Sequence, residues 1–312
     1  MKVLNRTEIE AGVTPAAAIA AIEAGFKAYS AGEVTVPPVG HLEFEHPPGE
    51  VHIKYGYRHG DSLFVVKIAS GFYDNPTHGL SSGSGVMLVF SARTGFPEAM
   101  LLDEGYLTNV RTAAAGAVAA RYLAPRQVNA IGVIGAGLQA RMQLDFLRHV
   151  VACRKAIVWA RDPSKAAAFA VPDFNIEAAD STADLAARCN LIITTTPSRT
   201  PLLAASAVRP GTHITAVGAD SPGKQELDAL LFARADIRVV DSRVQCFQFG
   251  EAAHSLRIHP ELRDSFVELG EIVADSSLGR RNDEQISVCD LTGVAIQDVE
   301  IAKVAYASVA SE

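Results

Sequence analysis

The sequence predicts an α/β fold in two parts, a doubly wound parallel sheet domain and an α+β domain. Three observations carry this prediction. A glycine turn near residue 135 joins an apolar, β-branched run to a segment of helical period. Strand-like and helix-like segments then alternate as far as residue 289, whereas residues 34–102 hold several strand-like runs with no helix between them. A chain of 312 residues is long enough for two domains that each bury a core.

The glycine turn, Gly135-Ala136-Gly137, follows a β-branched strand and precedes a helix. Gly135 allows the chain to reverse, and Gly137 removes a side chain where a pyrophosphate would approach the backbone. Ala140 is the third small position, where the helix packs on the strand. The phosphates would then lie at the helix N-terminus. The turn predicts a Rossmann dinucleotide-binding unit, with an ordinary glycine turn of an α/β domain as the alternative.

The region after the glycine turn alternates as a parallel sheet requires. Strands are expected over 156–159, 175–178, 191–196, 212–218, 237–240 and 286–289, and helices over 163–170, 181–189, 224–231 and 267–274. A final helix over 293–310 should return to pack on the first domain.

The region before the glycine turn predicts a helix over 11–30, an antiparallel meander, and a second helix. The expected strands cover 34–38, 50–57, 61–70, 83–90 and 97–102, and the second helix covers 106–122. This helix is almost entirely Ala and Gly between 113 and 120, which lets a neighbouring element approach its backbone closely. Pro125 marks the crossing between domains.

Two cations stand out in this first region. Lys67 lies in a strand that is apolar on both faces, so its amine either faces a ligand or reaches solvent from an edge strand. Arg111 and Thr112 lie in the early turns of the helix over 106–122, where an anion can bind to free N–H groups. The alternative for Arg111 is an ordinary solvated side chain.

Composition argues against several classes of function. Charged residues are 20% of the chain, and a net charge of −7 that is not concentrated in runs argues against nucleic acid or an anionic membrane as partner. No apolar run approaches the ~20 residues that span a bilayer, and the N-terminus lacks the features of a secretory signal. We therefore expect a cytoplasmic protein with small-molecule ligands. The four cysteines are far apart, which predicts buried thiols rather than a metal or disulfide framework.

The end of the second Rossmann strand indicates the nucleotide. An NAD-binding unit has an acidic residue about 20 residues past the glycines, where it binds the ribose 2′-hydroxyl. Here Ala160 and Arg161 take that position, and Asp162 before Pro163 is expected to cap a helix. Because arginine suits a 2′-phosphate, Arg161 favours NADP(H), with NAD(H) as the alternative.

Seven segments in order resemble the ornithine cyclodeaminase and mu-crystallin family over nearly the whole chain. They are Val65–Ile68, His78–Ser82, Leu107–Ala114, Ile134–Ala140, Ile193–Pro197, Val217–Leu227 and Thr292–Asp298. The resemblance implies a homodimer whose first domains pair their sheets into a shared barrel, with the active site in the interdomain cleft. Residues 1–122 with 293–312 would form the substrate-binding and dimerisation domain, and residues 123–292 the dinucleotide-binding domain.

The resemblance also implies roles for individual residues. Lys67 and Arg111 would hold a substrate carboxylate, Ser82 would line the pocket, and Asp220 would be the acid/base; Lys67 could also donate a proton. From the residues alone, Asp220 is equally well a turn former. The residues expected to bind the cofactor are Arg111, Thr112, Gly135, Ala136, Gly137, Leu138, Gln139, Arg161, Thr195, Thr196, Val217, Gly218 and Gly293.

One departure from the family leaves the substrate open. Members with cyclodeaminase activity usually carry an arginine just after a Val-x-Pro-Pro-like stretch, but here Val36–Pro38 is followed by Val39-Gly-His. Lys54, in a β-like run, could supply the missing cation, as in family members associated with ectoine breakdown, or it could be solvated.

The expected function is that of an NAD(P)-dependent enzyme acting at the Cα–N bond of a small amino or imino acid. The first choice is an ornithine cyclodeaminase-like ammonia-lyase, which needs only catalytic nucleotide because the hydride is returned. The alternative is an imine reductase or amino-acid dehydrogenase, which changes the nucleotide stoichiometrically. A non-catalytic, mu-crystallin-like NADPH- and ligand-binding protein is the remaining possibility.

Overall fold

The computed structural model describes residues 1–310, and the chain forms two compact units. Unit 1 comprises Met1–Arg111 and the C-terminal segment from Ala295, and unit 2 comprises Thr112–Val294. The first division falls inside helix α3 (Tyr106–Leu123), whereas the sequence places it at the end of that helix.

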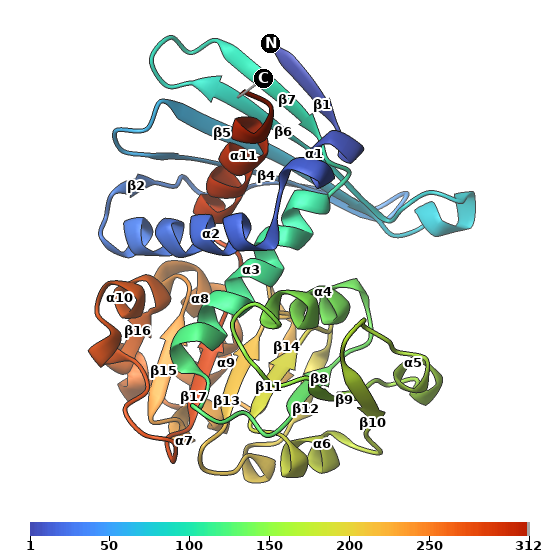
Figure 1. Cartoon of the computed structure of the whole chain (residues 1–312), viewed down its shortest axis with the longest axis vertical. Helices are drawn as coiled ribbons and strands as arrows, with labels where there is room; N and C mark the ends of the chain where they lie inside the picture. Colours follow the sequence, from blue (N-terminus) through green and yellow to red (C-terminus); the bar gives the residue numbers. More distant parts are fainter. Residues whose placement is uncertain (311–312) are drawn as a thin grey trace. The chain divides into compact units, whose positions relative to one another are not determined.

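Unit 1 is built on a seven-stranded sheet in the order β1-β7-β6-β5-β4-β2, with β3 paired to the free edge of β4 (Figure 1). Its strands are β1 (Lys2–Asn5), β2 (Val34–Thr35), β3 (Gly40–Phe44), β4 (Gly49–Arg58), β5 (Leu63–Phe72), β6 (Gly83–Ser91) and β7 (Pro97–Leu102). Strands β4 to β7 pair antiparallel, which confirms the expected meander. The prediction missed β1, which pairs parallel to β7, and β3, which lies in a Pro/Gly-rich stretch.

The helices of unit 1 pack on this sheet and on one another. They are α1 (Arg6–Gly12), α2 (Pro15–Ser30), the short 3₁₀ helix η1 (Asn75–His78), and α11 (Ala295–Ala310). The single helix expected over 11–30 is wrong at its start: α2 begins at Pro15 because the Thr14 side chain caps it, and α1 is a separate helix before it. Helix α11 packs against α2, β4 and β5, as expected for the C-terminal helix.

Unit 2 holds an all-parallel eight-stranded sheet in the order β10-β9-β8-β11-β13-β17-β15-β16. Its strands are β8 (Ile131–Ile134), β9 (Lys155–Trp159), β10 (Asn175–Ala178), β11 (Leu191–Thr194), β13 (His213–Ala216), β15 (Ile237–Val240), β16 (Phe266–Glu268) and β17 (Ser287–Asp290). Four of the expected strands are buried along their full length, as apolar β-branched runs require in a sheet covered on both faces.

Seven α-helices accompany this sheet within Thr112–Val294, besides most of α3. They are α4 (Leu138–Leu147), α5 (Pro163–Ala167), α6 (Thr182–Arg188), α7 (Leu230–Arg234), α8 (Arg243–Phe249), α9 (Glu251–Ile258) and α10 (Leu269–Ala274). The Ala/Gly face of α3 does receive a close neighbour: buried Gln143 of α4 donates to the Thr112 carbonyl at 3.1 Å.

Two helix predictions in unit 2 are wrong in part, and two helices were not predicted. The helix expected over 224–231 is wrong, since its first half is β14 (Gln225–Leu227), paired with β12 (Arg199–Leu203), and α7 starts later. The helix expected over 267–274 begins as strand β16. Helices α8 and α9 were missed. Each error involves a short segment, for which period alone does not separate strand from helix.

The chain reverses its direction of travel across the sheet at β8. Strands β9 and β10 follow on one side of it, and the chain then returns to place β11 on the other side. In an open parallel sheet, ligands bind at such a switch point, beyond the carboxyl ends of the strands. Those ends are Gly135 after β8 and Thr195 after β11.

Among residues 1–310, no single helix is long and apolar enough to cross a membrane, and only the bent pair of α1 and α2 passes a test of length and composition.

Candidate functional site

The glycine turn has the geometry that the sequence predicts. Gly135 has a φ of 121°, a conformation that side chains disfavour, and an added Cβ would lie 2.5 Å from the Thr195 hydroxyl oxygen. Its N–H donates to the carbonyl of Trp159 in β9 at 2.8 Å, while Thr195 N–H donates to Ile134 at 2.9 Å. Two backbone hydrogen bonds therefore hold the turn against both neighbouring strands, which leaves no space for a side chain at Gly135.

Gly137 is different, because nothing in unit 2 occupies the space beside it. It is the N-cap of α4 with φ −86° and ψ −167°, an ordinary extended conformation. An added Cβ would meet no atom within 4 Å. No packing in unit 2 explains a glycine here, and no side chain caps α4. The helix N-terminus, its positive dipole end and this open space together fit a phosphate group.

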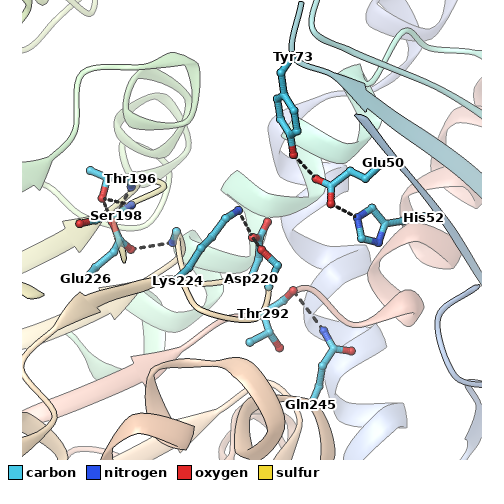
Figure 2. Close-up of polar contacts among 12 residues, drawn as sticks. Glu50, His52, Tyr73, Thr196, Ser198, Asp220, Lys224, Glu226, Gln245 and Thr292 are labelled. Atoms are coloured by element: carbon cyan, nitrogen blue, oxygen red, sulfur yellow. Dashed lines mark hydrogen bonds and ion pairs between the residues drawn. The ribbon is translucent and has the colours of Figure 1, made fainter. Parts of the chain in front are cut away.

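A buried carboxylate, Glu226 of β14, joins the loops that follow β11 and β13 (Figure 2). Its oxygens accept from Thr194 Oγ1 at 2.6 Å, from the Thr196 N–H and hydroxyl at 2.5 and 2.8 Å, and from the Gly218 N–H at 2.8 Å. Burial raises the pKa of Glu226 to about 7, although these donors oppose the shift. Glu226 therefore fixes Thr196 and Gly218, two of the residues expected to bind the cofactor.

Glu226 was not among the predicted site residues. Its only signal in the sequence is its place in the Val217–Leu227 segment, in which the predicted roles fall on Val217, Gly218 and Asp220. The strand β14 that carries Glu226 lies within the segment 224–231, for which the sequence predicts a helix.

The remaining predicted cofactor residues of unit 2 lie at the same end of the sheet or in nearby loops. Val217 directly follows β13 and is buried, and Gly293 donates its N–H to Asp241 Oδ2 at 2.7 Å. Ala136, Leu138 and Gln139 continue the glycine turn into α4, with Leu138 exposed. Thr112 contributes its carbonyl to Gln143, as described above.

Arg161 lies just after β9 and is exposed. The neighbouring Asp162 is engaged as predicted: it caps α5, accepting from the Ser164 N–H at 3.0 Å and its hydroxyl at 2.6 Å. The position at which NAD-binding units place an acidic residue is thus Ala160 or Arg161, and the adjacent carboxylate is committed to the helix.

Unit 1 contains a buried cluster in which the cations Lys67 and Arg111 meet Asp298. We call it the cationic cluster because its cations outnumber the aspartate. Lys67 of β5 donates from Nζ to Asp298 Oδ1 at 2.9 Å, and Arg111 Nε lies 3.4 Å from the same oxygen. Arg111 Nη1 also donates to Gln297 Oε1 at 3.0 Å. Lys67, Arg111 and Asp298 are 3%, 9% and 2% exposed, so the structure brings together the two predicted cations but pairs them with an aspartate of α11.

Lys54 belongs to the same cluster. It lies directly across from Lys67 in the β4–β5 register, and its charge acts on Asp298. Burial alone would raise the pKa of Asp298, but the charges of Lys67, Arg111 and Lys54 outweigh it and hold that pKa below its usual range. Burial also lowers the pKa of the Lys67 amine, although Asp298 opposes this shift.

The cluster keeps polar atoms that no described residue satisfies. Asp298 Oδ2 and Gln297 Nε2 are buried and have no hydrogen-bond partner within residues 1–310. Buried polar atoms of this kind are rare in native proteins and point to a bound ligand or water. Asp298 was missed as a site residue although it closes the Thr292–Asp298 segment, because α11 meets β5 only in the folded chain.

The other two predicted site residues, Asp220 and Ser82, both lie exposed in loops. Asp220 lies in the loop after β13, is exposed, and pairs with Lys224 Nζ at 2.6 Å (Figure 2). This geometry suits both an acid/base and a turn former. Ser82 lies exposed just before β6, and within residues 1–310 no hydrogen bond or ion pair joins its side chain to Lys67 or Arg111.

The fold and the glycine turn define a Rossmann-class protein with a second, α+β domain. The whole chain, residues 1–312, matches the ornithine cyclodeaminase/mu-crystallin family, and the protein belongs to that family. It is 42% identical over 315 residues to a putative dehydrogenase of Rhizobium meliloti, covering 98% of this chain and 95% of the relative. It is 40% identical over 314 residues to an uncharacterized cyclodeaminase of Sinorhizobium fredii, with coverage of 98% and 95%.

Several solved structures match all of the chain, and three of them are named for reductase or dehydrogenase activity. The iminosuccinate reductase of Paracoccus denitrificans in complex with NAD⁺ has a TM-score of 0.92, 33% identity and 97% of its chain covered. The Δ¹-pyrroline-2-carboxylate reductase of Thermococcus litoralis with NADH and L-proline has a TM-score of 0.92, 29% identity and 98% covered. An archaeal alanine dehydrogenase dimer with bound NAD has a TM-score of 0.89, 33% identity and 96% covered.

Proposed function

We propose that this protein is a nicotinamide-dependent enzyme that acts at the Cα–N bond of a small α-imino or α-amino acid. The cationic cluster is the observation that carries the proposal. Lys54, Lys67 and Arg111 are three cations whose charges lower the pKa of Asp298. Burial raises the pKa of nearby Asp103. The excess positive charge favours an anion, and a substrate carboxylate is the anion that all such acids share.

The nucleotide would be held by unit 2. The N-terminus of α4 and the space beside Gly137 suit the pyrophosphate, and the loops fixed by Glu226 suit the rest of the cofactor. When bound, a nicotinamide cofactor supplies or accepts the hydride. We propose NADP(H) as the preferred form because Arg161 follows β9 and Asp162 is committed to capping α5. The solved relatives are named with NAD⁺ or NADH, so both forms belong in the test.

Lys67 is the proposed proton donor. In the reductive direction the imine carbon gains a hydride and the imine nitrogen gains a proton, so a group near that nitrogen must release one. A buried lysine with a lowered pKa releases a proton more readily than a solvated one, and the hydrogen bond to Asp298 orients the amine. Arg111 would orient the carboxylate, since guanidinium binds it with two hydrogen bonds. Asp220 remains the second acid/base candidate.

Our first candidate for the reaction is the net reduction of an imino acid, or the reverse dehydrogenation. The three solved relatives described above are named for reductase or dehydrogenase activity, although two other whole-chain matches are named as a probable ornithine cyclodeaminase and a lysine cyclodeaminase. The chain also lacks the arginine after Pro38 that family members with cyclodeaminase activity usually carry. The cyclodeaminase, first choice from sequence, stays as the second candidate because the family and the Sinorhizobium relative bear that name.

A homodimer built on the sheet of unit 1 is part of the proposal. The face of β4 opposite Lys54 is apolar and includes Tyr55 and Tyr57, which pair with Val66 and Phe64 of β5. Tyr55 is 41% exposed, which leaves apolar surface for a second copy to cover. The alanine dehydrogenase relative is named as a dimer.

The first experiment follows NADPH and NADH absorbance when purified protein is mixed with small cyclic and acyclic α-imino acids. Ammonia release from diamino acids is measured in parallel with catalytic NAD(P)⁺. Stoichiometric loss of reduced nucleotide supports the reductase, and ammonia release at constant nucleotide supports the cyclodeaminase. Failure of both, together with tight nucleotide binding, would shift the function to ligand binding without catalysis.

A separate experiment tests the role of Arg161. The variant Arg161→Ala should raise the KM for NADPH about tenfold or more and leave the KM for NADH nearly unchanged, because only the 2′-phosphate loses its partner. Lys165→Ala, on the nearby helix α5, serves as the control. An unchanged NADPH KM in Arg161→Ala would remove Arg161 from the cofactor site.

A further inference from the structure

A second group of chemistry-bearing side chains lies in unit 1, on the paired strands β3 and β4. His41, Glu50 and His52 form it, and we call it the histidine–glutamate cluster. Their candidate ligand atoms, one from each residue, all lie within 4.8 Å of one another. His41 and His52 are direct cross-strand partners, and Glu50 lies two residues before His52 on the same face of β4. The three side chains thus converge because of strand register alone.

The donor atoms of this cluster converge on one carboxylate oxygen. His52 Nε2 lies 3.2 Å from Glu50 Oε2, and His41 Nε2 lies 3.9 Å from the same oxygen. The two imidazole rings stack with centroids 4.8 Å apart and an interplanar angle of 9°. In a tetrahedral zinc site, bonds of about 2.0–2.1 Å place the ligand atoms about 3.3 Å from one another. The cluster is therefore close to a metal-binding arrangement, and small side-chain rotations would complete it.

The other oxygen of Glu50 is also held. Tyr73 donates its hydroxyl to Glu50 Oε1 at 2.6 Å, which leaves Oε2 directed at the imidazoles (Figure 2). Carboxylates that bind metals are usually fixed by such an outer hydrogen bond. Two imidazoles and one oriented carboxylate are a ligand set for a divalent first-row transition ion, and they leave at least one coordination position open.

We propose that His41, Glu50 and His52 bind one divalent transition-metal ion, with Zn²⁺ as the representative, and that Tyr73 orients Glu50 for it. The site is independent of the proposed enzyme activity. It lies on the same face of β4 as Lys54, since residues 50, 52 and 54 alternate with those that face away. A metal ion there would lie along the strand from the cationic cluster.

The test measures binding of Zn²⁺ alone to the full chain by calorimetry, after removal of metals with a chelator. One equivalent per chain is expected. His52→Gln and His41→Gln should each weaken binding at least tenfold, and Tyr73→Phe should weaken it about tenfold to a hundredfold while keeping all three ligands. Co²⁺ in place of Zn²⁺ should give the intense visible absorption of a low-coordinate site, and His52→Gln should abolish it.

Two exposed histidines of unit 1 serve as matched controls. His59→Gln and His78→Gln should bind Zn²⁺ as the unaltered protein does, because neither belongs to the cluster. Thermal melting without metal checks that each variant folds. Failure to bind Zn²⁺, or binding that survives both His41→Gln and His52→Gln, would overturn the proposal.

Discussion

Lys67 and Asp298 form an ion pair that solvent hardly reaches, at 3% and 2% exposure. Such a pair contributes little to stability by itself, because desolvation of both ions offsets their attraction. Removal of one partner is costly, since the other charge stays buried. The pair is better explained by the proposed function: Asp298 opposes the lowering of the Lys67 pKa and would orient the amine where the cationic cluster is proposed to bind an anion.

We expect Lys67→Met to lower turnover by about 10²- to 10⁴-fold, because it removes both a proton donor and a carboxylate partner. Arg111 remains beside Asp298 in this variant, so part of the electrostatic balance survives. The measurement is steady-state kinetics together with thermal melting, which separates lost chemistry from lost folding. Lys303→Met is the matched control, as Lys303 also pairs with a carboxylate of α11, Glu300, but outside the cluster. A Lys67→Met enzyme with unchanged kcat would contradict the role.

Glu226 offers a second test, directed at nucleotide binding. Its oxygens accept four hydrogen bonds, and a glutamine would turn an amide N–H₂ toward some of these donors. Glu226→Gln should raise the Kd for NAD(P)H at least tenfold and lower the free energy of unfolding by about 1–3 kcal/mol. Nucleotide fluorescence titration and denaturant unfolding measure the two effects. Glu284→Gln, at an exposed position, should change neither, and tight nucleotide binding by Glu226→Gln would remove it from the cofactor site.

The glycine turn between β8 and α4 allows a structural role to be separated from a binding role. Gly135→Ala should destabilise the protein by about 1–3 kcal/mol, because its φ of 121° is unfavourable for alanine and Thr195 is in the way. Gly137→Ala should fold normally, since its backbone is ordinary and its surroundings are open. It should nevertheless weaken nucleotide binding at least tenfold, because the added methyl group occupies the proposed phosphate site.

The melting temperature of each variant measures the structural role, and its nucleotide Kd measures the binding role. Gly137→Ala with unchanged affinity would mean that the open space beside α4 is not a phosphate site.

A group of buried acids in unit 2 links stability to pH. Burial raises the pKa of Glu251 to about 9 and that of Asp290 to about 8. The charge of Asp290 adds to the shift of Glu251, and the charge of Asp241 adds to that of Asp290. In the unfolded chain such groups release their protons near pH 4. The folded protein therefore holds protons that the unfolded chain loses, so this stabilisation is complete below about pH 4 and is lost as pH rises through about 9.

We expect the melting temperature to fall between about pH 6 and pH 9, and Asp290→Asn to make that fall shallower. Glu177→Gln changes a half-buried carboxylate whose pKa is lowered, mainly by its hydrogen bond with Lys155, and should keep the full slope. Melting curves over this range measure the effect. An equal slope in Asp290→Asn and in the unaltered protein would show that Asp290 is already ionised in the folded state.

The sequence alone determined the Rossmann unit, the antiparallel meander, the long helix α3 and the family. These features are local: a β-branched strand, a glycine turn and a helical period lie within about 20 residues of one another, and alternation fixes which face Lys67 occupies. The sequence did not predict the short elements β14, β16, α8 and α9. Whether such segments form strand or helix depends on the neighbours that pack against them.

Tertiary structure decided what the site residues contact. Asp298 meets Lys67 across 231 positions and Gln297 meets Arg111 across 186, distances in sequence that no local pattern spans. Likewise, Glu226 reaches Thr194 and Thr196 only because β14 folds back beside the ends of β11 and β13. The pattern of residue types identified which charges this protein carries, whereas the pairing and burial that shift their pKa values arise from packing between elements far apart in the chain.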